Sequence, residues 1–292
     1  MTALTGNARE HLLARLQAWR KHAIHIGLSP RRSPAWNGLL PREIPESVAA
    51  YASAFDTAFL TVGPRGGPDA ATAERLRRQA GEEFRWTIVV EDEQMIYRFP
   101  HGWHDREKRG LVNPRFLDPE GIIASITPLL LRLGPSAAMV LLNIAPVYRT
   151  EALRFEGFLE ALARCLDALP PPHRYAVHTA EFLLPGCLEM LRARNVAHVS
   201  PLSPDAPFAH TADVSLVRSP VTAAEEDFRF AVRRALEEGQ ELYMYLGDGA
   251  EGGAVAPVPP VPPGAGGERL ARLLAGLDAE LARRSPIRRQ AA

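Results

Sequence analysis

The chain has 292 residues, of which 46% are hydrophobic, enough for one large α/β core or two smaller ones. Its 34 basic and 34 acidic side chains cancel, so no overall field would draw it to nucleic acid or to an anionic membrane. Its two cysteines, Cys165 and Cys187, form neither a metal-binding spacing nor a disulfide framework, which favours a reducing cytoplasm.

The first predicted element is an amphipathic helix within residues 1–22, with Leu16 and Trp19 on its apolar face. This segment lacks the apolar stretch of a secretion signal. The longest uncharged apolar runs, residues 122–131 and 137–145, are too short to cross a bilayer. We therefore predict a cytoplasmic protein without a membrane-spanning segment.

Short β-rich runs then alternate with helical patterns, which is typical of βαβ units and a parallel sheet. Eight such runs with intervening helices favour an α/β fold with a single (β/α)8 TIM barrel over residues 23–284. Within residues 196–220 a Pro-rich loop without a clear helix joins two of the strands. The predicted strands cover residues 23–28, 57–62, 85–90, 139–144, 174–178, 196–200, 213–217 and 241–246. The predicted helices cover residues 46–54, 70–80, 119–132, 151–169, 185–194, 223–238 and 268–284.

Three segments depart from this alternation. Residues 91–116 form a long polar connection, and connections of that length are usually functional or disordered. Residues 254–267 form a Pro/Gly-rich insertion before the last helix, for which a solvated spacer is favoured over a recognition ligand. Residues 285–292 form a basic tail, interpreted as a frayed terminus.

Several strand motifs occur in order from about His25 to Gly253. They read HIGLSPRRSPAW, YASAFDTAFLTV, FRWTIVVE, LGPSAAMVLLNIAPVYR, RYAVHTAEF with LEMLRARNVAHV, and ELYMYLGDGAEGGA. In this order and spacing the chain resembles the domain of unknown function 72 (YecE-like) family. The resemblance implies a TIM barrel, and it implies no reaction because the activity of that family is unsettled.

The chain departs from the family pattern mainly at the ends of strands. Phe59 and Thr61 stand where the resemblance implies glutamate and asparagine, and Val89 stands where it implies lysine. The strand-seven segment SLVRSP lacks the histidine of the family. Because the C-terminal ends of the strands build the active site of a TIM barrel, we interpret these changes as a diverged or lost active site.

The candidate catalytic residues are titratable side chains near predicted strand ends. Glu91 follows the third strand, His178 and Glu181 close the fifth, and Asp248 lies in a Gly-rich turn after the eighth. Carboxylates and an imidazole at a barrel mouth can exchange protons with a substrate. The competing interpretations are an acidic loop start for Glu91 and a hydrogen-bonded structural histidine for His178.

The candidate binding residues include three arginines. Arg31 and Arg32 follow the first strand and Arg218 follows the seventh, and arginine can clamp a carboxylate or phosphate with two hydrogen bonds. Arginine is abundant in this chain, so surface solvation is the favoured alternative. The polar residues and the tryptophan that match the family complete the set: Trp36, Asn143 and Glu251.

The densest polar cluster of the 91–116 connection is formed by His101, His104 and Asp105. The spacing of the two histidines lets both reach one metal ion, but zinc and iron sites need three or four ligands. We therefore predict a solvated loop, no metal and no cofactor.

Two functions remain open. The first is a barrel that has lost its ancestral chemistry and acts by binding a small molecule or a protein partner. The alternative is an enzyme, a hydrolase, lyase or isomerase, that acts on a small polar or phosphorylated metabolite at the C-terminal barrel mouth. Convergence of His178, Glu91 and Asp248 around one pocket, with shifted pKa values, would favour the enzyme. A mouth lined by Phe59, Leu60 and Val89 and plugged by the 91–116 connection would oppose it. A nucleic-acid role is disfavoured by the neutral charge.

Overall fold

The computed structural model describes residues 10, 14–16, 18–29, 48–63, 67–91, 93–144, 156–171, 173–179, 186–201, 210–220, 225–247, 270–272 and 274–279. Several predicted features lie outside these residues, namely Arg31, Arg32, Trp36, Glu181, Asp248, Glu251, the 254–267 insertion and the 285–292 tail.

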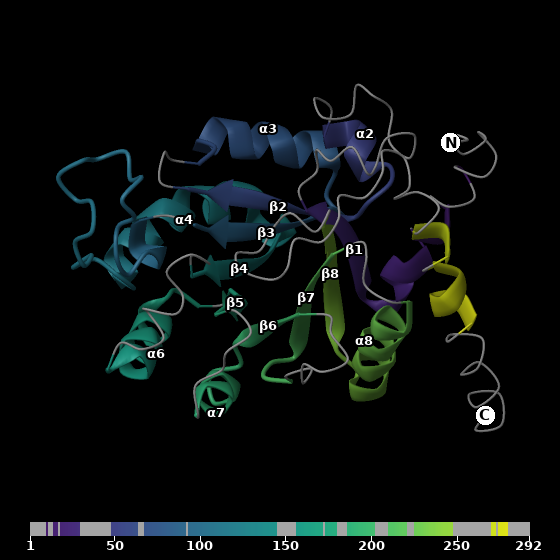
Figure 1. Cartoon of the computed structure of the whole chain (residues 1–292). Helices are drawn as coiled ribbons and strands as arrows, with labels where there is room; N and C mark the ends of the chain where they lie inside the picture. Colours follow the sequence, from purple (N-terminus) through teal and green to yellow (C-terminus); the bar gives the residue numbers. More distant parts are fainter. Residues whose placement is uncertain are drawn as a thin grey trace. The chain divides into compact units, whose positions relative to one another are not determined.

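Eight parallel strands follow one another in the order β1-β8-β7-β6-β5-β4-β3-β2, with helices between them along the chain (Figure 1). This is the order of a (β/α)8 barrel, so the predicted fold class is confirmed. The strands are β1 (Ile24–Ser29), β2 (Thr57–Val62), β3 (Arg85–Val90), β4 (Ala137–Asn143), β5 (Tyr175–His178), β6 (Ala197–Pro201), β7 (Val214–Pro220) and β8 (Glu241–Gly247).

The helices agree with the predicted ones in place and type. They are α2 (Val48–Ala52), α3 (Ala70–Ala80), α4 (Pro119–Leu133), α6 (Phe158–Ala168), α7 (Cys187–Arg192) and α8 (Glu225–Glu238), with short 3-10 helices η1 (Arg20–His22), η3 (Glu93–Met95) and η4 (Gly134–Ser136). Residues 270–272 and 274–279 are also helical. No helix in the described part of the chain has both the length and the apolar character needed to cross a membrane.

The chain divides into two compact units, which are described separately. Unit 1 comprises Met1–Ala58, Ser200–Phe208 and Val214–Ala292, and unit 2 comprises Phe59–Val199 and Ala209–Asp213. Unit 1 therefore contains β1, β7 and β8, and unit 2 contains β3, β4 and β5.

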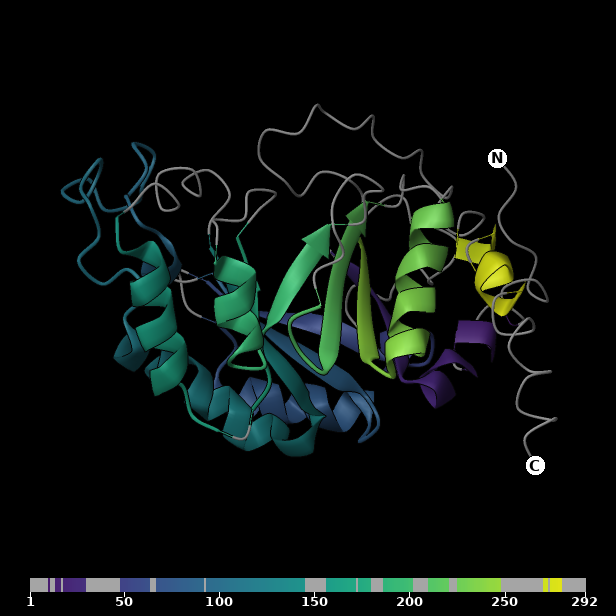
Figure 2. The ribbon, with the colours of Figure 1, turned by 90° about the horizontal axis from the view of Figure 1, so that it is seen from below.

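In unit 2, the helices α3, α4, α6 and α7 lie on the same side of the strands (Figure 2). Helix α4 shows why the sequence folds this way locally. Asp118 caps it by accepting a hydrogen bond from the backbone N–H of Glu120, and Pro119 occupies the first turn, where no N–H is needed. Its side chains Ile122 and Ile126 are spaced to lie on one face and are fully buried.

The 91–116 connection is compact and not merely solvated. Ile96, Phe99 and Trp103 form a small apolar core. An antiparallel β-bridge between Arg98 and Val112 joins the earlier and later parts of the connection. Asn113 is 3% exposed, and its Nδ2 donates to the backbone carbonyls of Glu93 and Ile96. His101 and His104 are exposed, as expected for a solvated loop, whereas the packing of Ile96, Phe99 and Trp103 against one another was not predicted.

In unit 1, β8 pairs with β1 on one side and β7 on the other. Gly27 lies where β1 comes closest to the start of β2, because a Cβ at this position would stand 2.4 Å from the carbonyl oxygen of Thr57. Thr57 in turn hydrogen bonds through its hydroxyl to that of Tyr245, at 2.7 Å. Only glycine fits this approach of two backbones.

Candidate active site at the ends of β3, β4 and β5

Three polar residues lie side by side at the C-terminal ends of neighbouring strands in unit 2. Asn143 ends β4 and is paired in register with His178, which ends β5. Glu91 directly follows β3, whose last residue Val90 is paired with Leu142 of β4. Parallel pairing therefore places Glu91, Asn143 and His178 at one level, and we call these three residues the strand-end row.

Asn143 links the other two members of the strand-end row by hydrogen bonds. Its Nδ2 donates to Oε1 of Glu91 at 2.5 Å, and its Oδ1 lies 2.7 Å from Nδ1 of His178. An ionised carboxylate only accepts, so it fixes the orientation of the amide with the NH2 toward Glu91. The amide oxygen then faces His178 and accepts the proton of Nδ1.

This arrangement sets the tautomer of the imidazole. When Nδ1 carries the proton of a neutral ring, Nε2 is the basic nitrogen. Asn143 is 5% exposed, whereas His178 is half-buried and Glu91 is exposed. The buried amide is thus a support for a histidine that is itself partly exposed.

An apolar layer lies one step below the strand-end row. Val89, Leu141 and Ala176 are paired in register and lie two residues before Glu91, Asn143 and His178 respectively, so they face the same side of the sheet. All three are at most 2% exposed. The polar groups therefore stand on a well-packed apolar base, which limits their movement.

The other described candidates lie elsewhere. Arg218 belongs to β7 of unit 1 and not to the turn after it, because β7 continues to Pro220; it is half-buried and paired in register with Tyr245. On β2, Phe59 and Thr61 alternate with Leu60, so Leu60 faces the opposite side and cannot line the same surface as Phe59.

The three weak metal candidates do not form a metal site. His101 and His104 are exposed, and the His104 ring packs against that of Trp103 with centroids 4.6 Å apart. Asp105 accepts a hydrogen bond from the backbone N–H of Glu107. Across the described ranges, no group of three or more His, Cys, Asp or Glu side chains is placed to hold a metal ion.

The two cysteines are poor nucleophiles. Both thiols are buried in helices, and burial raises the pKa of Cys165 to about 12 and that of Cys187 to about 11. The reactive thiolate is therefore scarce at neutral pH.

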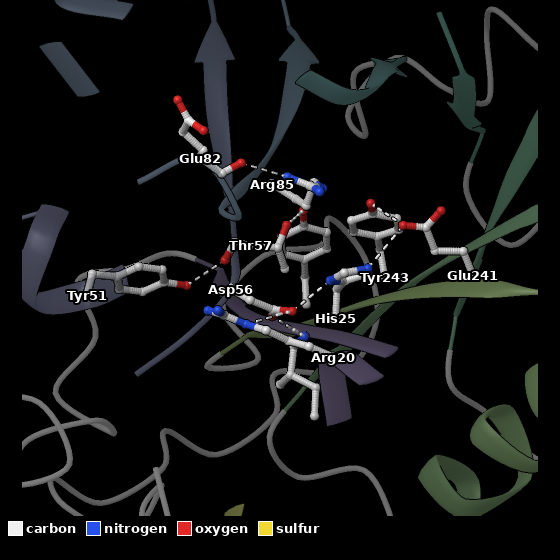
Figure 3. Close-up of polar contacts among 11 residues, drawn as sticks. Arg20, His25, Tyr51, Asp56, Thr57, Glu82, Arg85, Glu241 and Tyr243 are labelled. Atoms are coloured by element: carbon white, nitrogen blue, oxygen red, sulfur yellow. Dashed lines mark hydrogen bonds and ion pairs between the residues drawn. The ribbon is translucent and has the colours of Figure 1, made fainter. Parts of the chain in front are cut away.

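A second polar cluster, in unit 1, was not predicted. His25 of β1 lies with Nδ1 2.6 Å from Oδ2 of Asp56 and Nε2 3.0 Å from Oε1 of Glu241, and the hydroxyl of Tyr243 donates to the same Glu241 oxygen (Figure 3). We call His25, Asp56, Glu241 and Tyr243 the β1 clasp. It lies where strands begin, the end of a TIM barrel that usually serves stability. The available signal was the position of these polar residues at or just before strand starts.

His198 of β6 was also missed, and it is a structural residue. Its ring nitrogen Nε2 lies 3.3 Å from the hydroxyl of Thr179, and burial lowers its pKa to about 4. His198 is paired with Val177, so it faces the side of the sheet opposite to His178. It is neutral at physiological pH and does not belong to the strand-end row.

Comparison with known proteins supports the fold. No protein-family model matches the chain, and no curated protein matches it. A protein of the domain of unknown function 72 family from Thermotoga maritima aligns with this chain at a TM-score of 0.54 and 16% sequence identity. The alignment covers 86% of this chain and 99% of that protein. Two crystal structures of a protein of this family from Enterococcus faecalis V583 also align, each with a TM-score of 0.53. One is 11% identical and covers 89% of this chain and 95% of its own, and the other is 12% identical and covers 86% of this chain and 97% of its own. In its fold the chain is therefore similar to proteins of the domain of unknown function 72 family, as its strand motifs predicted.

Proposed function

We propose that the chain is an enzyme that takes a proton from a small polar metabolite and returns one to it, with Nε2 of His178 as the general base and acid. One observation carries this proposal: Asn143 accepts the Nδ1 proton of His178, so that Nε2 is the basic nitrogen of the neutral ring. Such an arrangement of base and orienting group recurs in unrelated enzymes. It suits a hydrolase, a lyase or an isomerase.

The orienting group is an amide, and this affects the chemistry. Asn143 fixes the ring without adding a full charge next to it, while Glu91 stands one hydrogen bond further away. A histidine held in this way is well suited to take up a proton in one step and release it in the next. The apolar layer below the row supports the geometry, because positioning within a fraction of an ångström matters for proton transfer.

A barrel that only binds its ligand is the second candidate. The observation that favours it is Val89, which faces the same side as the strand-end row and stands where the family resemblance implies a lysine. An enzyme that used that cation would have lost it here. Binding and proton transfer make different predictions for the same ligand.

The test begins with a thermal-shift screen of small polar and phosphorylated metabolites, since a specific ligand raises the melting temperature by mass action. The ligand is then incubated with the protein in D2O, and conversion and deuterium incorporation are followed by NMR. We expect wild-type protein to catalyse one or both, and His178→Gln to slow the reaction by about 10²–10⁴-fold.

The matched control is His104→Gln, which changes an exposed histidine of the 91–116 connection. It should react at the wild-type rate, and both variants should melt at the wild-type temperature. A ligand that raises the melting temperature but undergoes neither conversion nor exchange with wild-type protein would overturn the enzyme proposal in favour of binding alone.

A further inference from the structure

One edge of β1 is held by side chains. The backbone N–H of Ile26 donates to Oδ1 of Asp56 at 3.0 Å, and that of Leu28 donates to the hydroxyl of Tyr51 at 2.8 Å. The Tyr51 hydroxyl donates in turn to the carbonyl of Thr57. These side chains satisfy buried donors that a neighbouring strand would otherwise satisfy, so the order of this edge depends on where Asp56 and Tyr51 are held.

The β1 clasp holds Asp56 in place. Oδ2 of Asp56 lies 2.6 Å from Nδ1 of His25, while its other oxygen accepts the Ile26 amide. Nε2 of His25 reaches Glu241, and the ring stacks on Tyr243 with centroids 4.6 Å apart. His25 is 9% exposed and Asp56 is 4% exposed, so water replaces little of this bonding.

Both ring nitrogens of His25 face carboxylate oxygens. Ionised carboxylates only accept hydrogen bonds, so both bonds require the doubly protonated imidazolium. A neutral ring has one N–H for two carboxylates, and its lone pair would face an anionic oxygen at about 3 Å. Loss of the proton therefore turns one attractive contact of a buried cluster into a repulsive one.

We propose that His25 is an alkaline-sensitive clasp, whose loss of a proton loosens Asp56 and opens the edge of β1 formed by Ile26 and Leu28. The described charged or titratable groups near the imidazole come from three parts of the chain. They are Asp56, just before β2; Glu241 and Tyr243 of β8; and Arg20 of η1, whose Nε lies 3.5 Å from Oδ2 of Asp56. The Arg20 guanidinium beside Asp56 offsets part of the charge of that carboxylate after His25 is neutral.

The direction of the effect follows from the protonation equilibrium. Burial by itself lowers the pKa of His25, but the hydrogen bonds to Asp56 and then Glu241 outweigh it and raise the pKa from 6.5 to about 8. A histidine whose folded pKa is raised stabilises the closed form fully below pH 6.5 and loses this contribution as the pH rises through 8. The difference of about 1.5 pH units corresponds to a roughly 30-fold change in the opening equilibrium.

The test is amide hydrogen exchange of the full chain between pH 6 and pH 9, expressed as protection factors so that the intrinsic dependence on pH is removed. We expect the protection of the Ile26 and Leu28 amides to fall about 30-fold in wild-type protein, with most of the change between pH 6.5 and 8. The amide of Val140, which donates to the carbonyl of Arg174 within unit 2, should keep constant protection.

His25→Gln removes the titrating group, so the fall should be absent in this variant. The matched control is His22→Gln, an exposed histidine of η1, which should show the wild-type fall. If His25→Gln does not fold, an NMR titration of the His25 ring in wild-type protein replaces it and should give a midpoint near pH 8, at the upper end of the range in which the amide protection falls. A flat wild-type profile, a fall that persists in His25→Gln, or a ring midpoint at or below pH 6.5 would overturn the proposal.

Discussion

At the scale of single residues, the strand-end row shows how one amide decides what a histidine can do. Glu91 orients Asn143, and Asn143 orients His178 through Nδ1. The same residue type at a strand end could have been an ordinary polar group on the surface, but at 5% exposure Asn143 is buried between two partners. Its side chain therefore links the Glu91 carboxylate to Nδ1 of His178, the nitrogen opposite the basic Nε2.

Removing this amide should change the tautomer of His178. Asn143→Ala removes the amide oxygen that accepts the Nδ1 proton, so the ring should move toward the Nε2–H form that dominates in free imidazole side chains. Long-range proton–nitrogen correlation spectra at a pH where the ring is neutral report which nitrogen is protonated. We expect mainly Nδ1–H in wild-type protein and a mixture in the variant. An unchanged tautomer would show that Asn143 does not orient the ring.

At the scale of elements, the repeating patterns were predictable and the irregular ones were not. The helix over 70–80 was predicted with the bounds that the structure has, because Asp69 caps its start and Gly81 follows its end. The strand over 57–62 was also predicted with its observed bounds, because it is a short β-rich run. The small core of Ile96, Phe99 and Trp103 was not predicted, because its apolar residues follow no helix or strand period. A local sequence pattern does not show what packs within a loop.

The residues of the candidate site were likewise predictable, whereas their contacts were not. Glu91, Asn143 and His178 were all singled out, since each falls at the end of a recognisable strand, but their mutual hydrogen bonds depend on the register of three strands. The β1 clasp was not predicted, because His25 is 31 residues from Asp56 and 216 residues from Glu241 in the sequence. Contacts over such separations leave no periodic signal in a single sequence.

The close approach at Gly27 is a feature of β1 that a single substitution tests. Gly27→Ala would place a Cβ 2.4 Å from the Thr57 carbonyl oxygen, a backbone atom that cannot rotate away. Such overpacking typically costs about 1–3 kcal/mol, so the free energy of unfolding in urea should fall by at least that amount. Gly63→Ala is the control, because a Cβ there would meet nothing within 4 Å. Equal stability of the two variants would show that the backbone of β1 can shift to accommodate the added methyl group.

At the scale of the whole molecule, each compact unit has its own polar cluster at a different end of its strands. The strand-end row of unit 2 lies where β3, β4 and β5 finish, and the β1 clasp of unit 1 lies where β1 and β8 begin. In TIM barrels the finishing ends carry chemistry and the starting ends carry stability. This division agrees with the two proposals, in which His178 of unit 2 transfers protons in a reaction and His25 of unit 1 holds the edge of β1.

The alkaline opening of the β1 edge should therefore stay local, and the two cysteines provide the test. Cys165 and Cys187 are buried in helices of unit 2, so they react with an alkylating reagent only when those helices open. At pH 9, where the β1 amides have lost protection, we expect alkylation by iodoacetamide to remain on the order of 10³-fold slower than in urea at the same pH. Comparing both rates at one pH cancels the greater thiolate fraction of an alkaline solution. Rapid alkylation of the native protein at pH 9 would mean that loss of the His25 proton unfolds far more than one strand edge.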